Sequence, residues 1–288
     1  MQSSPVIARL TRGLRRVPPA IMLAFILLVL VLIIAIFGSS LSSHDPTALG
    51  LRNRLKPPFL FGGSKTHILG TDHLGRDILS RIFMATQTTL MIASLGTVVG
   101  LVIGASLGIA SGLIGGRVDT VIMFLVDTQM AIPFTLIALT VIAIFGSNLS
   151  VLIPVIGLSS WCRFARLARG EVRAVLGMEY VQGARALGVS EWRIAWKYIL
   201  PNIVSPLVVL ATYNFSQIML LESSLSFLGL GVQPPGASLG SLVGAGRDYL
   251  MTAWWIALAP GLMLVLITMI MSLLGDYVRD VYDPRLRH

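Results

Sequence analysis

Long apolar stretches without charged residues dominate the chain. Five of them contain no Asp, Glu, Lys or Arg: 17–43, 82–116, 128–162, 198–221 and 249–275. Each is longer than the roughly 20 residues that a helix needs to cross about 30 Å of hydrocarbon. The pattern therefore predicts at least five membrane-spanning helices.

The third stretch is too long for a single helix. Gly146-Ser147-Asn148 interrupts it, so we expect one helix near 120–145 and another near 149–164. The first stretch is longer than the apolar part of a signal peptide, and no small-residue cleavage site follows it. We interpret it as a retained helix, and the chain as an all-α integral membrane protein with six transmembrane helices.

Composition and charge agree with a membrane protein. Hydrophobic residues make up 55% of the 288 residues, and mean hydropathy is +0.83, more apolar surface than one soluble core would bury. If both termini are cytoplasmic, 15 of the 22 Lys and Arg residues lie inside, as the positive-inside rule requires. The net charge of +9 then indicates orientation and contact with anionic lipid rather than nucleic-acid binding. Cys162 is the only cysteine, so no intrachain disulfide can form.

The stretch EYVQGARALGVSEWRIAWKYILPN, residues 179–202, is unusually polar and lies in the largest predicted inner loop. Its pattern predicts two short amphipathic helices, with Gly188 in the left-handed conformation between them, Ser190 as the next cap and Pro201 as the stop. One face of each helix is defined by a set of small and apolar residues: Tyr180, Gly183, Ala184 and Leu187, then Trp192, Ala195, Trp196 and Ile199. The alternative is a loop that rests on the lipid headgroups with its tryptophans at the interface.

This stretch resembles the cytoplasmic coupling loop of permeases from binding-protein-dependent ABC importers. The family pattern is Glu-Ala-Ala, three residues, Gly, nine residues, then Ile-x-Leu-Pro. Here Gln182-Gly183-Ala184 stands at its start, Gly188 at its glycine and Tyr198-Ile199-Leu200-Pro201 at its end, so Gln182, Gly183 and Tyr198 depart from it. The resemblance implies a set of ATPase-coupling residues: Glu179, Gln182, Gly183, Ala184, Arg185, Leu187, Gly188, Leu200 and Pro201.

Three further stretches resemble the C-type subunit of the dipeptide, oligopeptide and nickel branch of these permeases. They are HILGTDHLGRDILSR at 67–81, SLSFLGLGVQPP at 224–235 and LGDYVRDVYDPRLR at 274–287. The resemblance implies a type-1 permease core of five helices at 86–275. A cytoplasmic tail, first helix and outer loop at 1–85 would precede it, and a cytoplasmic tail at 276–288 would follow it.

The resemblance also implies partners in a bacterial cytoplasmic (inner) membrane. These are a second homologous permease, two ATP-binding subunits that carry ATP and Mg, a solute-binding protein outside, and membrane lipid. The chain itself has no phosphate-binding G-x-x-x-x-G-K-[ST] loop, because Gly62-Gly63-Ser64-Lys65-Thr66 lacks the glycine before lysine. We therefore expect a transport subunit with no catalytic residues and no cofactor of its own. Peptides are the expected substrate, with nickel chelates or glutathione as alternatives.

A glycine stripe marks the second predicted helix. Six glycines recur at intervals of four residues: Gly96, Gly100, Gly104, Gly108, Gly112 and Gly116. Glycine at this spacing lets helix backbones approach closely, and the stripe turns by about 40° per step, so we expect it to serve more than one neighbour. A general enrichment of glycine in membrane helices is the alternative.

Two carboxylates lie in or near predicted spans. Asp127 and Glu222 are candidates for the substrate pathway, because a charge is costly in the bilayer, although both could instead be interfacial. In the outer loop, His44, His67 and His73 accompany Asp72 and Asp77, which raises the question of a metal site. Because the histidines are not spaced at i, i+4, we expect a loop role and no metal.

Residues 223–248 are apolar but rich in Gly and Pro, so we expect an outer segment over the mouth of the pathway rather than one helix. Two other classes of protein fit less well. A secondary transporter driven by an ion gradient would need an internal repeat and a midplane ion site, and neither is visible. An intramembrane enzyme would need HExxH or a Ser and His pair, and the predicted helices contain neither.

Overall fold

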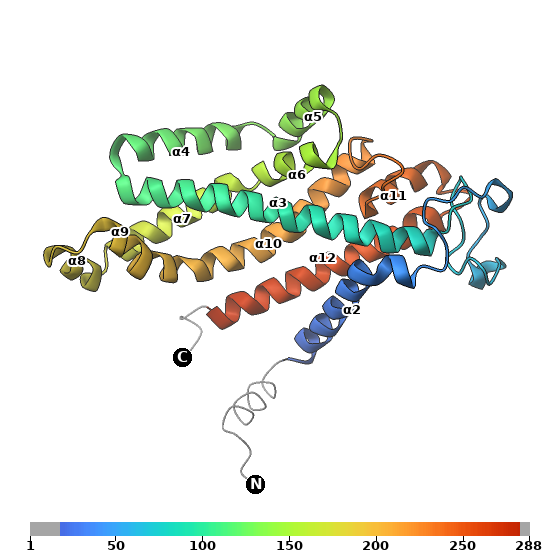
Figure 1. The fold of residues 1–288 in the computed structure, drawn as a ribbon, viewed down its shortest axis with the longest axis horizontal. Coiled ribbons are helices and arrows are strands. Elements are labelled where there is room, and N and C mark those ends of the chain that lie inside the picture. The colour runs from blue at the N-terminus through green and yellow to red at the C-terminus, as the bar shows by residue number, and fades with distance from the viewer. Residues whose placement is uncertain (1–17, 283–288) are drawn as a thin grey trace, which may run out of the picture.

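The computed structural model describes residues 18–282, and this part of the chain is built from helices around one long central helix. The longer helices run alongside one another (Figure 1). In chain order the α-helices of this part are α2 (Pro19–Leu41), α3 (Ile78–Ile114), α4 (Gly116–Ala131), α5 (Phe134–Phe145), α6 (Leu149–Leu158), α7 (Trp161–Leu176), α8 (Glu179–Ala186), α9 (Glu191–Ile194), α10 (Leu200–Phe227), α11 (Leu239–Gly246) and α12 (Trp255–Tyr282). The all-α membrane fold expected from the sequence is confirmed.

Within residues 18–282, five helical segments are long and apolar enough to cross a membrane. They are Pro19–Gly38, Ile78–Ile114, Leu149–Leu176, Glu191–Phe227 and Trp255–Val281. The pair α4 and α5 makes a sixth candidate, bent by 87°. Six of the arginines counted as cytoplasmic lie outside the described residues: Arg9, Arg12, Arg15, Arg16, Arg285 and Arg287.

The expected continuous helix near 120–145 is wrong. The chain leaves α4 at Ile132, which has extended backbone (φ −100°, ψ 130°), and re-enters a helix after Pro133. Proline has no N–H to donate and disfavours helical backbone in the residue before it. The break at Ile132-Pro133 therefore follows from local chemistry that the apolar pattern concealed.

Two other predicted helix ends are also wrong. The fourth span does not end near residue 164, because α7 carries the helical path on to Leu176 after a short turn at Ser159 and Ser160. Pro201 does not stop a helix, since it lies at the start of α10, where a missing N–H is tolerated. The π-helical turn η3 (Ala195–Ile199) directly precedes it and shifts the hydrogen-bond register there.

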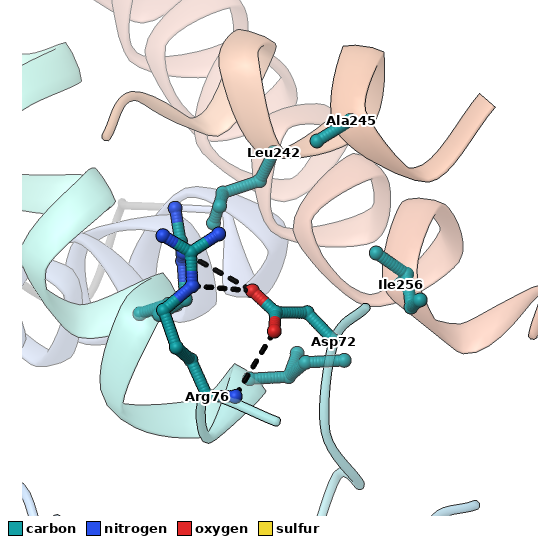
Figure 2. A pocket seen from close by; sticks show the side chains of 7 residues that line it. Asp72, Arg76, Leu242, Ala245 and Ile256 are labelled. Atoms are coloured by element: carbon teal, nitrogen blue, oxygen red, sulfur yellow. Dashed lines mark hydrogen bonds and ion pairs between the residues drawn. The ribbon is translucent and has the colours of Figure 1, made fainter. Parts of the chain in front are cut away.

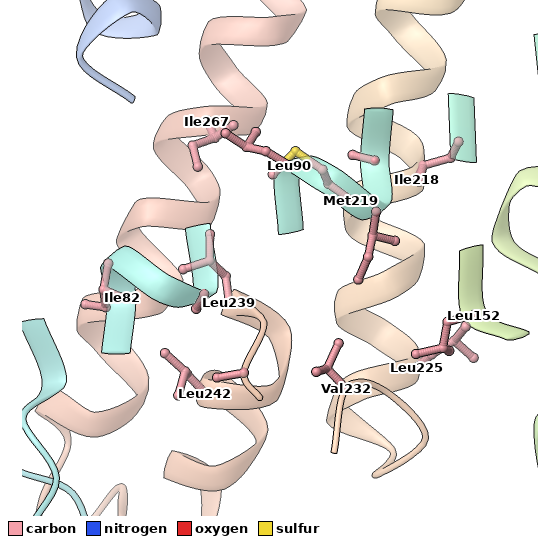
Figure 3. Packing of buried hydrophobic residues seen from close by; sticks show 14 of the residues in the cluster. Ile82, Leu90, Leu152, Ile218, Met219, Leu225, Val232, Leu239, Leu242 and Ile267 are labelled. Carbon is pink, nitrogen blue, oxygen red and sulfur yellow. The ribbon is translucent and has the colours of Figure 1, made fainter. Parts of the chain in front are cut away.

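The central helix α3 packs against α2, α6, α7, α10 and α11. Figure 3 shows side chains of α3, α6, α10, α11 and α12 meeting in the main apolar cluster, among them Ile82, Leu90, Leu152, Met219, Leu239 and Ile267. A second cluster joins α7 to α8, α9 and α10, and includes Phe164, Val172, Val181, Ile194 and Ile203. Many other apolar side chains, such as Phe25 and Leu30 of α2, stay exposed, as expected of a surface that faces lipid or partner helices.

The prediction that segment 223–248 is not one continuous helix is confirmed. The helix α10 ends at Phe227, a turn with Gly229 in the left-handed conformation (φ +84°) follows, and α11 begins at Leu239. The backbone N–H of Leu239 donates to Thr89 Oγ1 of α3 at 2.9 Å, and Ser238 caps α11. This hairpin is therefore held against the central helix.

Candidate functional site

The stretch 179–202 forms a helix-turn-helix unit at one end of the bundle, where α8 and α9 lie in Figure 1. Gly188 has φ +79°, the left-handed conformation expected for the turn. The N–H of Gly188 donates to the Arg185 carbonyl and that of Val189 to the Ala184 carbonyl, which is the hydrogen-bond pair of a Schellman motif. Ser190 lies at the N-cap of α9 with extended backbone, but its side chain makes no capping hydrogen bond.

The buried face of this unit is formed largely by residues outside the two apolar faces that the sequence predicted. Val181 and Ile194 are completely buried against α7 and α10, and Ala184 and Ile199 join them. Periodicity could not show which face meets α7, because both faces of these short helices carry apolar residues. Of the predicted face residues, Ala184 and Ile199 are buried and Ala195 is half-buried, whereas Tyr180, Gly183, Leu187, Trp192 and Trp196 are exposed.

The opposite face exposes large apolar side chains. Exposed fractions are 86% for Leu187 and 73% for Trp192, and Tyr180 and Trp196 are also exposed. Arg185 forms an exposed ion pair with Glu191 at 2.7 Å across the turn. The remaining resemblance-implied residues are Glu179, Gln182 and Gly183, exposed on α8, and Leu200 and Pro201 at the start of α10. Exposed apolar surface of this kind marks a site of interaction with a protein or a membrane.

The glycines of α3 lie against the two helical pieces of the fourth span. A Cβ at Gly104 would lie 2.6 Å from Phe164 Cβ, one at Gly108 2.8 Å from Ala168 Cβ, and one at Gly112 2.7 Å from Val172 Cγ1. A Cβ at Gly100 would lie 2.7 Å from the Gly157 carbonyl. These distances leave no room for a side chain. The helices α3 and α7 therefore pack backbone to backbone.

The two ends of the stripe behave differently. At Gly96 the nearest atom to an added Cβ is Ile218 Cγ2 of α10 at 3.4 Å, so this position meets a second neighbour. Gly116 is not part of the packed stripe, because α3 ends at Ile114 and the chain reverses through Gly115 and Gly116, both with positive φ. An added Cβ at Gly116 would meet nothing within 4 Å.

The two predicted pathway carboxylates lie on different helices with different surroundings. Asp127 of α4 is exposed and accepts a hydrogen bond from Arg166 of α7 at 2.7 Å. Glu222 of α10 is only 1% exposed, and its Oε1 accepts from Ser226 Oγ at 2.6 Å. Its Oε2 has no hydrogen-bond partner among the described residues. The desolvation cost is therefore larger for the Glu222 carboxylate than for the exposed Asp127 carboxylate.

A charged cluster that the sequence reading did not identify joins three helices near the α8–α9 end. The carboxylate of Asp119 (α4) accepts from Ser111 Oγ (α3) at 2.5 Å and from the guanidinium groups of Arg169 and Arg173 (α7). Both arginines lie on α7. Their i, i+4 spacing was the available signal in the sequence, but Asp119 lies 50 residues before Arg169 and 54 before Arg173.

A second buried charge cluster lies in the segment 42–77 between α2 and α3 and includes Arg81 of α3. Figure 2 shows the Asp72 carboxylate beside Arg76, with Leu242, Ala245 and Ile256 around it. Arg76 Nε lies 2.7 Å and Arg81 Nη1 3.1 Å from Asp72 Oδ2. Nearby, burial lowers the pKa of His73, partly offset by the neighbouring Asp72. Arg81 thereby ties this segment to α3, and Trp255 Nε1 of α12 donates a hydrogen bond to the Thr71 carbonyl at 3.2 Å.

Residues 100–288 match the family described as binding-protein-dependent transport system inner membrane component. A putative peptide transport system permease protein of Brucella suis is 37% identical over 99% of this chain and 93% of its own length. The chain belongs to this family. It is a multi-pass inner membrane permease component of an ABC importer, as the sequence resemblance implied.

Other relatives of this permease carry related names. The di/tripeptide transport system permease protein of Pseudomonas aeruginosa is 36% identical over 91% of this chain and 86% of its own, and a glutathione transport permease of Pectobacterium atrosepticum is 35% identical over 78% and 75%. Among solved structures, the inward-facing MetNI methionine ABC transporter has a TM-score of 0.56 at 19% identity, over 72% of this chain and 96% of that one. At that identity the likeness shows the fold of the permease core alone.

Proposed function

We propose that this permease forms part of the translocation pathway for di- or oligopeptides in an ATP-driven importer. Its relatives from Brucella and Pseudomonas are named as peptide and di/tripeptide permeases, and they align over most of this chain. Glutathione, itself a small peptide, and nickel chelates are the alternatives within the branch. A solute-binding protein outside would deliver the substrate, and a second homologous permease would complete the pathway.

The exposed apolar face of the 179–202 unit carries the coupling part of the proposal. Leu187 and Trp192 lie on either side of a turn whose backbone is held by two hydrogen bonds, and the other face of the unit is buried. An apolar surface on a rigid unit loses less conformational entropy when it binds a protein partner than a flexible loop would lose. We assign this face to contact with one of two ATP-binding subunits, which carry ATP and Mg.

The contacts of the buried face of the 179–202 unit suggest how a displacement of this unit is passed to the membrane-spanning helices. The buried side of α8 and α9 packs on α7, which packs closely on α3 through the glycines and is tied to α4 by Asp119. A displacement of the 179–202 unit by nucleotide would therefore move these helices as one body. The two arrangements would be states whose populations nucleotide shifts.

The distribution of basic residues along the bundle supports the same assignment. In Figure 1, α12 runs from the end that carries α11 toward the end that carries α8 and α9, and the α3–α4 turn lies at that second end. This is the end rich in Arg and Lys, which the positive-inside rule places in the cytoplasm. Both termini are then cytoplasmic, and the 42–77 segment faces outward.

Substituting Leu187, the most exposed apolar residue of the unit, tests this proposal. In a complex purified with the second permease and the ATP-binding subunits, Leu187→Glu should lower retention of those subunits and dipeptide uptake into proteoliposomes by about tenfold or more. Met251→Glu is the matched control, since Met251 is 97% exposed and follows η4 (Arg247–Tyr249) near α11. Its ATP-binding subunits should be retained as in wild type. Full retention and uptake by Leu187→Glu would contradict the assigned contact, and uptake of nickel chelate but no peptide would contradict the substrate.

A further inference from the structure

Three side chains that bind metals in other proteins converge in the outer segment. His44 follows α2, His67 lies in the middle of the segment, and Asp77 is the N-cap of α3. One donor atom from each residue can be chosen so that all lie within 4.8 Å of one another. The fold therefore brings together two imidazoles and a carboxylate that are far apart in sequence.

The geometry of the pair His67 and Asp77 is well defined. His67 Nδ1 lies 3.0 Å from Asp77 Oδ1, and both residues are buried. The other oxygen of Asp77, Oδ2, accepts from the N–H and the hydroxyl of Ser80 and so caps α3. Asp77 Oδ1 is therefore held in place by a helix terminus and points at the His67 ring.

His44 completes the group from the surface side. Its ring centroid lies 4.8 Å from that of His67, with the ring planes tilted by 35°. In the described part of the chain the His44 ring makes no hydrogen bond, whereas the backbone of His44 is held by Ser42 Oγ at 2.5 Å. Because His44 is only half-buried, an ion could reach the group from outside.

We propose that His44, His67 and Asp77 bind one divalent transition metal ion of the Zn²⁺ or Ni²⁺ class. Imidazole nitrogen and carboxylate oxygen are ligands for such ions, and three protein ligands leave a fourth position for water. His67 Nδ1 and Asp77 Oδ1 are hydrogen-bonded at 3.0 Å, near the roughly 3.3 Å that separates two donors about 2.0 Å from a tetrahedral metal. The ion would take the place of the proton between them, and that proton would be released to water. His44 would close on the ion from its present place.

The ion would act as a clamp in the outer segment. It would connect the chain just after α2 to the start of α3, across a segment whose large apolar side chains, such as Leu60 and Phe61, are mostly exposed. Binding to the folded chain alone would stabilise this arrangement by mass action. The expectation of a loop role without metal rested on sequence spacing, which cannot show that the fold joins two of the three histidines.

Metal binding to the full-length chain, purified in detergent with its tag removed and stripped with EDTA, tests the proposal. We expect about one Zn²⁺ per chain by mass spectrometry after gel filtration, and His44→Gln should weaken binding by at least about tenfold. His44 is the position to change, because substituting Asp77 would also remove the cap of α3, and substituting His67 would remove its buried hydrogen bond to Asp77. Zn²⁺ should raise the unfolding temperature of the wild type and not of His44→Gln.

His73→Gln is the matched control. His73 belongs to the same segment but stacks on Tyr249 with ring centroids 5.4 Å apart and lies outside the group. It should bind Zn²⁺ as the wild type does. Absence of bound Zn²⁺ and Ni²⁺ in the wild type, equal affinity in His44→Gln, or equal loss in both variants would overturn the site.

Discussion

The contact between α3 and α7 makes a sharp prediction at Gly104. A methyl group there would lie 2.6 Å from Phe164 Cβ and 3.0 Å from the Trp161 carbonyl carbon. Non-bonded carbons prefer about 3.5 to 4.0 Å, so Gly104→Ala must push the two helices apart by about 1 Å at this level. Because backbone atoms are among the neighbours, rotation of a side chain cannot relieve the overlap.

The magnitude follows from two opposing terms. Overpacking of a well-filled contact typically costs about 1 to 3 kcal/mol, whereas alanine in a helix interior gains about 1 kcal/mol over glycine. Gly170→Ala on α7 has the second term alone, since an added Cβ there meets nothing within 4 Å. The difference between the two variants should therefore be about 1 to 3 kcal/mol. Gly96→Ala, whose nearest neighbour lies at 3.4 Å, should fall between them.

The assay is the free energy of unfolding of the full-length chain, from SDS titration in detergent micelles followed by circular dichroism. Comparing the three alanine variants cancels the helix propensity and leaves the packing term. We expect the order Gly170→Ala, then Gly96→Ala, then Gly104→Ala from most to least stable. If Gly104→Ala unfolded within about 0.5 kcal/mol of Gly170→Ala, close packing of α3 on α7 would be refuted.

Three further predictions concern coupling, charge and orientation. Valine disfavours the positive φ of Gly188, so Gly188→Val should leave membrane insertion intact while uptake and substrate-stimulated ATP hydrolysis by the complex fall sharply; wild-type uptake would contradict it. Asp119→Asn leaves two arginines without their carboxylate and should destabilise the chain by about 2 kcal/mol in the same titration. Asp127→Asn breaks only an exposed ion pair and should lower the free energy of unfolding by about 1 kcal/mol or less. An equal loss of stability in Asp119→Asn and Asp127→Asn would contradict the assignment of Asp119 to a more strongly bound cluster. A reporter after residue 288 should be cytoplasmic and one near Gly63 external, and the reverse would overturn the orientation.

Much of the architecture could be predicted because the bilayer constrains sequence strongly. Charge-free stretches located the membrane helices, since an unpaired charge or an open backbone group is costly in hydrocarbon. The left-handed turn at Gly188 could also be predicted, because a short-range pattern of glycine between amphipathic segments determines it. The spacing of the glycines from Gly100 to Gly112 likewise pointed to a closely packed helix face.

Helix ends depended on details that hydropathy averages out. The break at Ile132-Pro133 lies within an apolar stretch, and the continuation through Pro201 depends on the π turn before it. Which face of α8 is buried also depended on the position of α7. Apolar residues on both faces left the choice between Val181 and Tyr180 to the tertiary contact.

The polar clusters were decided by tertiary structure alone. Asp119 meets Arg169 across 50 residues, and His44 meets His67 and Asp77 through the folding of the outer segment. A sequence shows which residues could donate, accept or ligate, and membrane physics shows where its helices are. Side-chain pairing acts over a few ångströms, so only the packing of distant segments determines which of those residues meet.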